Sequence, residues 1–247
     1  MTVTIAIIGG TGFSELKAFS LLTTHALDTP YGPPSADLQI GTLFGQPLAY
    51  LPRHGLPHRL PPHQVNYRAN LAALSAFGIK KVIGIAAVGG ISPPMKPATI
   101  AVPDQLIDYS YGRVQTFHEG PGEPVVHIDF TEPYTPSLRK ALVRAAADAC
   151  VPLVDGGVYG CTQGPRLETA AEIRRMERDG CDLVGMTGMP EAALAREAGL
   201  DYVCLAVVAN WAAGKTAGEI SLEEIHGHLD AAMVNVLKIL EAWLKSA

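Results

Sequence analysis

The sequence has little of the charge that marks nucleic-acid-binding proteins. Charged residues make up 17% of its 247 residues, and the formal net charge at pH 7 is -5. A nucleic-acid backbone calls for a basic face, so we expect no nucleic-acid partner. No apolar run reaches the roughly 18 to 20 residues that span a bilayer, which argues against a membrane protein. Residues 1–8 are apolar but lack a basic flank and a cleavage site, so we expect a cytoplasmic protein without a signal peptide.

Cysteine is also scarce. The four cysteines are widely spaced and form no Cys-x-x-Cys pair: Cys150, Cys161, Cys181 and Cys204. This usage is typical of buried thiols in a reducing compartment rather than of a disulfide framework. No His, Cys and Asp residues cluster at metal-ligand spacing either. We therefore expect neither a metal nor an organic cofactor.

Apolar residues, at 48% of the chain, are sufficient for one sizeable core, and we expect a single domain over residues 1–247. Short Val- and Ile-rich runs predict strands at Thr4–Ile8, Leu48–Leu51, Lys81–Ala87, Gly157–Thr162, Leu183–Met186 and Tyr202–Ala209. Helical patterns between them predict helices at Val65–Phe77, Ser137–Cys150, 169–179, Glu191–Ala198 and 221–245. The alternation predicts an α/β domain with a mixed, mainly parallel central sheet flanked by helices.

A glycine-rich turn follows the first predicted strand. Gly10-Thr11-Gly12 supplies two glycines of the dinucleotide-binding pattern, but Glu15 stands where the third is needed. A nicotinamide-dependent oxidoreductase remains an alternative, because Asp28 lies near the place of its ribose-binding acid. The turn can equally hold a bare phosphate through backbone N–H groups and the Thr11 hydroxyl, or serve only as a tight turn.

Several polar residues stand where strands end. Arg53 and His54 follow one strand and could bind an anion, Arg53 by its fork of donors and His54 as a further donor. A surface ion pair beside a structural histidine is the alternative. Thr187 lies near a helix N-terminus, which favours anions. Asn210 ends an apolar strand, either as a ligand-binding amide or as a turn cap.

Taken in order, these segments resemble the trimeric purine nucleoside phosphorylases, most closely their methylthioadenosine phosphorylase branch. The motifs that carry the resemblance are Ile-Ile-Gly-Gly-Thr-Gly at 7–12, Arg-His-Gly at 53–55, Val-Asn-Tyr-x-Ala-Asn at 65–70, Gly-Pro-Arg at 164–166 and Gly-Met-Thr-x-Met-Pro-Glu at 185–191. Five motifs in the right order, from the first strand to the terminal helix, make a specific match.

The resemblance implies where each part of the reaction takes place. Phosphate would be bound by Thr11, Arg53, His54, the backbone of Ala86 and Ala87, and Thr187. The family usually has a threonine at the position of Ala86, so one hydroxyl contact is expected to be absent. Met186 would lie along the ribose. The resemblance also implies a homotrimer in which a residue of the 110–130 loop, His118, closes the neighbouring pocket.

The base pocket separates the branches of the family. The methylthioadenosine branch carries two aspartates where Asn210 and Ala212 stand here. The amide of Asn210 can donate to O6 and N7 of a 6-oxopurine, and the carboxylate of Glu168 can accept from the N1–H of that base. Without the resemblance, Glu168 would be interpreted as a solvated acid in the first turn of a helix. Leu222 suits a 5′-methylthio group better than a hydroxyl, although core packing would explain it as well.

We therefore expect cleavage of S-methyl-5′-thioinosine by phosphate, which yields hypoxanthine and 5-methylthioribose 1-phosphate, with Asn210, Glu168 and His54 as catalytic residues. Phosphate is then a co-substrate, and the only partners are small molecules. The alternatives are an inosine or guanosine phosphorylase, a methylthioadenosine phosphorylase, the oxidoreductase, and a nucleoside-binding module without turnover.

Overall fold

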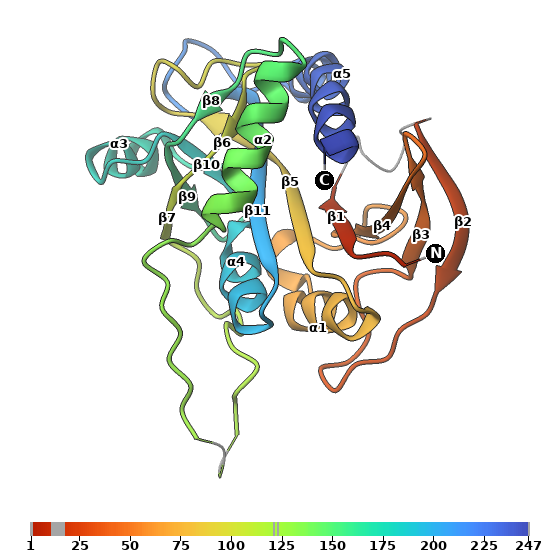
Figure 1. The fold of residues 1–247 in the computed structure, drawn as a ribbon. Coiled ribbons are helices and arrows are strands. Elements are labelled where there is room, and N and C mark those ends of the chain that lie inside the picture. Colours follow the sequence, from red (N-terminus) through yellow and green to blue (C-terminus); the bar gives the residue numbers. More distant parts are fainter. Residues whose placement is uncertain (1, 11–17, 121, 123, 247) are drawn as a thin grey trace.

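The computed structural model describes residues 2–10, 18–120, 122 and 124–246. The helices of this part are α1 (Tyr67–Phe77), α2 (Pro136–Asp148), α3 (Ala170–Arg178), α4 (Gly188–Glu197) and α5 (Leu222–Ser246), with a 3-10 turn at Pro62–Gln64. The strands are β1 (Ile5–Gly9), β2 (Phe19–His25), β3 (Leu38–Leu43), β4 (Gln46–Pro52), β5 (Lys81–Gly90), β6 (Ile100–Val102), β7 (Gln105–Asp108), β8 (Val154–Asp155), β9 (Val158–Cys161), β10 (Leu183–Gly185) and β11 (Asp201–Trp211) (Figure 1).

All of these strands belong to one mixed sheet. Its main path runs β2-β3-β4-β1-β5-β10-β9-β7, while β11 pairs with β5 and carries β6 and β8 beyond it. The pairs β1–β4, β1–β5, β5–β11, β9–β10, β7–β9 and β6–β8 are parallel. The expected α/β class with a mixed, mainly parallel sheet is therefore confirmed.

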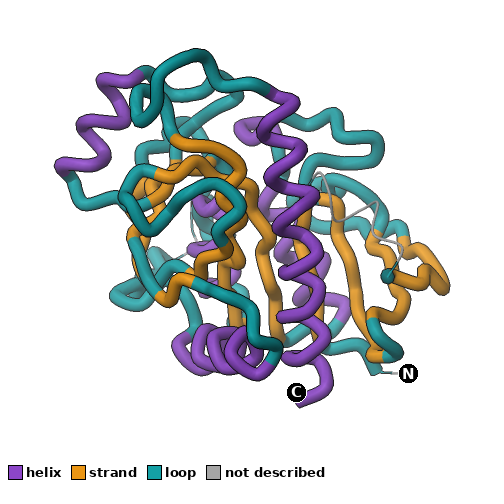
Figure 2. Tube along the Cα trace, turned by 90° about the horizontal axis from the view of Figure 1, so that it is seen from above, coloured by secondary structure: helices purple, strands orange, loops and turns teal. Residues whose placement is uncertain are grey.

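Helices cover both faces of the sheet, which explains why its central strands are apolar without alternation. Along β11, Cys204 and Ala206 pack into the cluster that holds α1 and α4. Leu205 and Val207 point the other way, into the cluster formed with α2 and α5. Figure 2 shows α5 running along its side of the sheet. The result is a three-layer arrangement whose middle layer is buried.

Strand β5 changes partner along one edge, and this change makes room for a site. Because β11 pairs with the opposite edge of β5 along its length, β1 and β10 must share the remaining edge. β1 pairs with residues 81–84, and β10 approaches from the other end and pairs with residues 89–90. Residues 85–88 lie between the two partners. The carboxyl ends of β1 and β10 therefore converge on one open stretch of strand, the kind of place where α/β sheets bind ligands.

Each of the five predicted helices is present in the described part of the chain, with shifts of a few residues at their ends. The helix predicted at 169–179 begins with a capping box formed by Thr169 and Glu172. The six predicted strands are present as well, and β2, β3, β6, β7 and β8 are additional. No helix in the described residues is both long and apolar enough to cross a membrane.

Candidate active site

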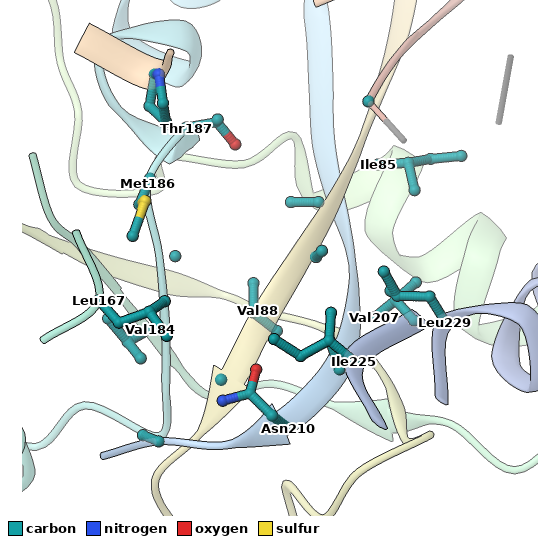
Figure 3. A pocket seen from close by; sticks show the side chains of 18 of the residues that line it. Ile85, Val88, Leu167, Val184, Met186, Thr187, Val207, Asn210, Ile225 and Leu229 are labelled. Atoms are coloured by element: carbon teal, nitrogen blue, oxygen red, sulfur yellow. The ribbon is translucent and has the colours of Figure 1, made fainter. Parts of the chain in front are cut away.

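A cavity of about 290 Å³ lies against the open stretch of β5. Its wall is formed by Ile85–Gly89, by Gly10 after β1, by the segment after β4, by the end of β10 and by the end of β11, and the start of α5 closes it. In Figure 3, Thr187 and Met186 lie at one end of the cavity, and Asn210 lies beside Ile225 at another, with Val88 between them. The cavity therefore brings together residues that lie far apart in the sequence.

Arg53 lies in the cavity wall, but most of its donors are already used. Its Nε and Nη2 atoms donate to the two carboxylate oxygens of Glu191 at 2.7 and 2.8 Å. Nη1 donates to the carbonyl oxygen of Ile85 and Nη2 to that of Ile8. Of the five N–H groups of a guanidinium, one on Nη1 remains. In this structure Glu191 therefore occupies the fork of Arg53, and one N–H is left for the anion predicted from the sequence.

The Arg53–Glu191 pair is buried: the side chains are 2% and 0% exposed. Tyr202 donates from its hydroxyl to Glu191 Oε1 at 2.8 Å. Burial by itself would lower the pKa of Arg53, but the adjacent carboxylate more than offsets it and raises that pKa well above its usual value. Burial also raises the pKa of Tyr202 well above its usual range. The pair is thus a fixed, internally neutralised element that joins β1, β5 and α4.

His54 presents an acceptor to the cavity. Its Nδ1 atom lies 2.8 Å from the carbonyl oxygen of Leu60, which can only accept, so the neutral ring carries its proton on Nδ1 and leaves Nε2 free of one. Burial, with Arg53 adding to it, lowers the pKa of His54 to about 4. The Cδ2–Nε2 edge faces Gly10, which also lines the cavity. A neutral His54 accepts a hydrogen bond at this edge, whereas the donor role predicted from the sequence takes a protonated ring.

His58, which the sequence analysis did not single out, stacks on His54 with ring centroids 4.4 Å apart. It also lines the cavity. The stacking holds the His54 ring between His58 and the Leu60 carbonyl. The orientation of the imidazole is therefore determined by its own loop.

Thr187 and residues 86–87 form a further part of the cavity wall. Thr187 precedes the first residue of α4 and is 8% exposed, and its side chain makes no capping hydrogen bond to the helix. Ala86 and Ala87, in the open stretch of β5, line the same cavity. The backbone N–H of Thr187 donates to the Tyr159 hydroxyl and that of Met189 to the Cys161 thiol, so the Thr187 hydroxyl is the donor that this turn leaves for an anion. Thr11 lies outside the described residues.

Glu168 and Asn210 also line the cavity. Thr162 donates from its hydroxyl to Glu168 Oε1 at 2.6 Å, so Glu168 is held in place while its other oxygen keeps acceptor capacity. Asn210 Nδ2 donates to the Trp211 carbonyl at 2.7 Å, which leaves Oδ1 and the second N–H of the amide for a ligand. Ala212 is buried beside them and adds no polar group.

The structure does not bring Leu222 to this cavity. Leu222 is the first residue of α5, and its side chain is 70% exposed. The helix reaches the cavity one turn later with Ile225, followed by His226, Leu229 and Met233. Their spacing of three, four and seven residues marks one helix face, a signal that was available in the sequence. His118 is exposed, and it does not line the cavity of its own chain.

Glu191 is the functional residue that sequence reasoning missed most clearly. Its sequence signals were the last position of the motif at 185–191 and a carboxylate in the first turn of a predicted helix, and the second is typical of a solvated residue. No pattern within one chain segment reveals a partner 138 residues away. Among the described residues, no group of three or more His, Cys, Asp or Glu side chains could hold a metal ion.

Comparison with known proteins agrees with this site. A probable S-methyl-5′-thioinosine phosphorylase of Xanthomonas campestris pv. campestris is 56% identical over 232 residues, which covers 94% of this chain and 93% of the relative. A 6-oxopurine nucleoside phosphorylase of Pyrococcus furiosus is 41% identical over 243 residues, covering 96% and 91%. The structure of methylthioadenosine phosphorylase from Schistosoma mansoni in complex with adenine superposes with a TM-score of 0.93 at 30% identity, covering 99% and 91%.

The sequence profile of the phosphorylase superfamily matches residues 4–245. The match extends from the strand before the glycine-rich turn to the end of the terminal helix. Every wall of the cavity falls inside it. The chain belongs to the phosphorylase superfamily.

Proposed function

We propose that this protein cleaves 6-oxopurine nucleosides with inorganic phosphate, without a further cofactor, and that S-methyl-5′-thioinosine is its preferred substrate. The observation that carries the proposal is that a single cavity is lined both by Glu168 and Asn210 and by Arg53, His54 and Thr187. The names of the two sequence relatives, a methylthioinosine and a 6-oxopurine nucleoside phosphorylase, support the same substrate class.

The base end suits hypoxanthine. Glu168 keeps an oxygen that can accept from N1–H, a proton that hypoxanthine carries and neutral adenine lacks. The Asn210 amide has Oδ1 for a proton at N7 and an N–H for O6. Adenine would instead face Glu168 with an unprotonated N1 and leave the carboxylate unpaired, which costs about 1 to 3 kcal/mol.

The phosphate end holds its ligand mainly through neutral donors. The Arg53 charge is balanced by Glu191, so Arg53 offers one N–H and a rigid wall rather than a free cation. The Thr187 hydroxyl and the Ala86-Ala87 backbone supply further donors. His54, neutral with an unprotonated Nε2, accepts the hydrogen of a phosphate hydroxyl and so fixes which oxygens of phosphate face the sugar.

The chemistry follows from this placement. Cleavage of the glycosidic bond builds positive charge on the ribose and negative charge on the purine, as in other glycosyl transfers. Phosphate held beneath the anomeric carbon stabilises the first charge and then forms the new C–O bond. Asn210 stabilises the second charge when the bond breaks, because it meets the developing anion at N7 and O6. The electron pair of the C–N bond passes to the purine, which takes up a proton from water at N7, where Oδ1 of Asn210 accepts a hydrogen bond from it.

The side of the cavity formed by α5 suits an apolar 5′ group. Ile225, Leu229 and Met233 line it, with Ile220 just before the helix and His226 as its polar member. An apolar wall of this kind discriminates a methylthio group from a hydroxyl by roughly 1 to 3 kcal/mol. The role first given to Leu222 therefore passes to these residues.

We further propose that the protein works as a homotrimer, as the resemblance implies. The segment between β7 and α2 projects from the body (Figure 1) and exposes Tyr111, Val114, Val125 and Val126. Exposed apolar side chains gathered on one projection favour contact with another subunit. Size-exclusion chromatography with light scattering measures the mass of the protein in solution directly. The mass of a monomer would contradict this part of the proposal.

The test compares three nucleosides: methylthioinosine, inosine and methylthioadenosine, each with and without phosphate, with release of free base as the readout. We expect hypoxanthine from methylthioinosine only when phosphate is present. Adenine should be released about 5- to 150-fold more slowly, which is the cost of the unpaired Glu168 expressed as a rate. Inosine should fall between, because it loses only the apolar 5′ contact.

A variant pair sharpens the result. Asn210→Asp should lower activity on methylthioinosine, because a carboxylate repels the purine anion and O6. Gln46→Glu adds the same charge at an exposed strand end outside the cavity and should change nothing. Faster release of adenine than of hypoxanthine would overturn the base assignment. Base release without phosphate would indicate a hydrolase, and binding without any turnover would indicate a binding module.

A further inference from the structure

Arg113 is a second hub of hydrogen bonds, half-buried and separate from the Arg53 pair. It lies on the segment between β7 and α2, and all five of its N–H groups have acceptors. Nε donates to the side chain of Gln163, Nη1 to the carbonyls of Met186 and Met189, and Nη2 to the carbonyls of Thr162 and Gln163. The guanidinium also lies over the ring of Tyr67, 5.7 Å from its centroid.

These carbonyls belong to two strands at the point where they separate. β9 and β10 pair as far as Cys161 and Gly185, and one more hydrogen bond, from Thr162 N to the Gly185 carbonyl, follows. Beyond that point the segment after β9 leads to Glu168, and the segment after β10 leads to α4. Carbonyls that leave a sheet need new donors. Arg113 supplies these donors to both segments at once and so sets the distance between the two segments.

The two segments that Arg113 joins carry residues from two parts of the cavity wall, Glu168 and Thr187. Thr162, whose carbonyl accepts from Arg113, donates to Glu168 at the base end. Met186, whose carbonyl also accepts from Arg113, precedes Thr187 at the phosphate end. A change in this distance would therefore move Glu168 relative to Thr187. Arg113 itself does not line the cavity.

Arg113 also carries an unbalanced charge. Every ion pair within the described residues involves other side chains, so no carboxylate lies within 4.0 Å of its guanidinium nitrogens. Arg53, by contrast, is paired with Glu191. Arg113 thus holds its unpaired positive charge against the carbonyl of Met186, the residue before Thr187.

We propose that Arg113 is a positioning residue for the reaction: it fixes the distance between the base-binding and phosphate-binding walls and adds an uncompensated positive charge behind the phosphate end. The proposal rests on the proposed function. A guanidinium is needed because four carbonyls and one amide oxygen approach it in a plane, and an ammonium has only three donors.

The kinetic test uses Arg113→Met and Arg113→Lys with methylthioinosine and phosphate varied separately. We expect Arg113→Met to lower kcat on the order of tenfold to a hundredfold, since misplacement of reacting groups by about 1 Å has such effects, and to raise KM for both substrates. Arg113→Lys keeps the charge, so it should restore KM for phosphate more fully than kcat. Wild-type kcat and KM values in either variant would overturn the proposal.

Arg68→Met is the matched control. Arg68 also lies over a tyrosine ring, that of Tyr31 at 5.1 Å, and pairs with Glu119 on the same projecting segment, but it touches neither wall. It should leave both KM values and kcat near wild type. An equal loss in Arg68→Met would assign the effect to the projecting segment as a whole and overturn a specific role for Arg113.

Hydrogen exchange separates this inference from the proposed function. Amides of residues 162–168 and 186–191 should exchange faster in Arg113→Met than in wild type and in Arg68→Met. Inactive wild-type protein would refute the proposed function, and hydrogen exchange would then still test whether Arg113 fixes the two segments. Unchanged amide exchange rates in both segments of Arg113→Met would overturn the positioning role of Arg113 even if the enzyme is active.

Discussion

The buried pair of Arg53 and Glu191 makes a sharp prediction about stability. Replacing Glu191 by Gln keeps the size of the side chain and removes its charge. Oε1 of Glu191 accepts from Arg53 and from Tyr202, and Oε2 accepts from Arg53 Nε. The amide can keep its oxygen at the doubly used position. Its NH2 group then faces the N–H of Arg53, so one hydrogen bond becomes a contact between two donors.

The magnitude follows from burial. Breaking a buried ion pair by neutralising one partner typically costs about 3 to 5 kcal/mol, because the other charge stays buried without compensation. Domains are stable by about 5 to 15 kcal/mol, so this is a large share of the total. At about 2 to 4 °C per kcal/mol for a chain of this size, Tm should fall by about 6 to 20 °C. Tyr202 alone cannot replace the lost acceptor, because it is itself a donor here.

Urea unfolding followed by circular dichroism measures the loss. Glu241→Gln is the control, since Glu241 pairs with Lys245 on the exposed surface of α5. Exposed pairs contribute about 0 to 1 kcal/mol, so the control should barely move. The double variant Arg53→Met/Glu191→Gln removes both charges and should recover part of the loss. A cost for Glu191→Gln no greater than for Glu241→Gln would refute the reasoning.

Two further predictions concern the same neighbourhood. Burial, with Arg53 adding to it, lowers the pKa of His54 to about 4. The folded protein then binds fewer protons than the unfolded chain between about pH 4 and 6.5, so stability is fully present above pH 6.5 and falls as the pH drops toward 4. Urea unfolding should lose about 2 kcal/mol more between pH 6.5 and 5 in wild type than in His54→Gln, and equal slopes would contradict this. Gly84→Ala should cost about 1 to 3 kcal/mol, because a Cβ would press on Tyr202 Oη and Glu191 Oε1, and an unchanged urea midpoint would show that the network yields freely.

Much of the fold could be predicted because its signals are local. The capping box at Thr169 and the glycine at position 78, with φ of 98°, mark where helices begin and end. The hairpin between β3 and β4 was missed for a local reason as well. Its two-residue turn has φ of 53° at Phe44 and 77° at Gly45, which are left-handed values usually signalled by Asn-Gly. With Phe at the first position that signal is absent.

The site divides in the same way. Residues expected at the cavity came from strand ends, and the parallel sheet gathers strand ends at one place, so Thr187 and Asn210 were found. The sequence could not predict which donors and acceptors of Arg53 and His54 are already used within the fold. The fork of Arg53 is taken by Glu191, and the His54 proton is taken by Leu60, and both partners are known only once the chain is folded. Residue type predicts what a side chain can bind, while tertiary structure decides what it has left to bind with.

One consequence concerns how the proposed enzyme would handle phosphate. Arg53 is neutralised by Glu191 and His54 is uncharged, so the groups in direct reach of the anion carry little net charge. An oxocarbenium-like ribose needs the negative charge of phosphate, and a fully paired phosphate would lend it little. A wall of neutral donors, with the charge of Arg113 held one peptide behind it, binds phosphate in place and leaves its charge available to the sugar. The buried ion pair then contributes rigidity rather than attraction, which is why loss of Glu191 should cost stability before it costs affinity for phosphate.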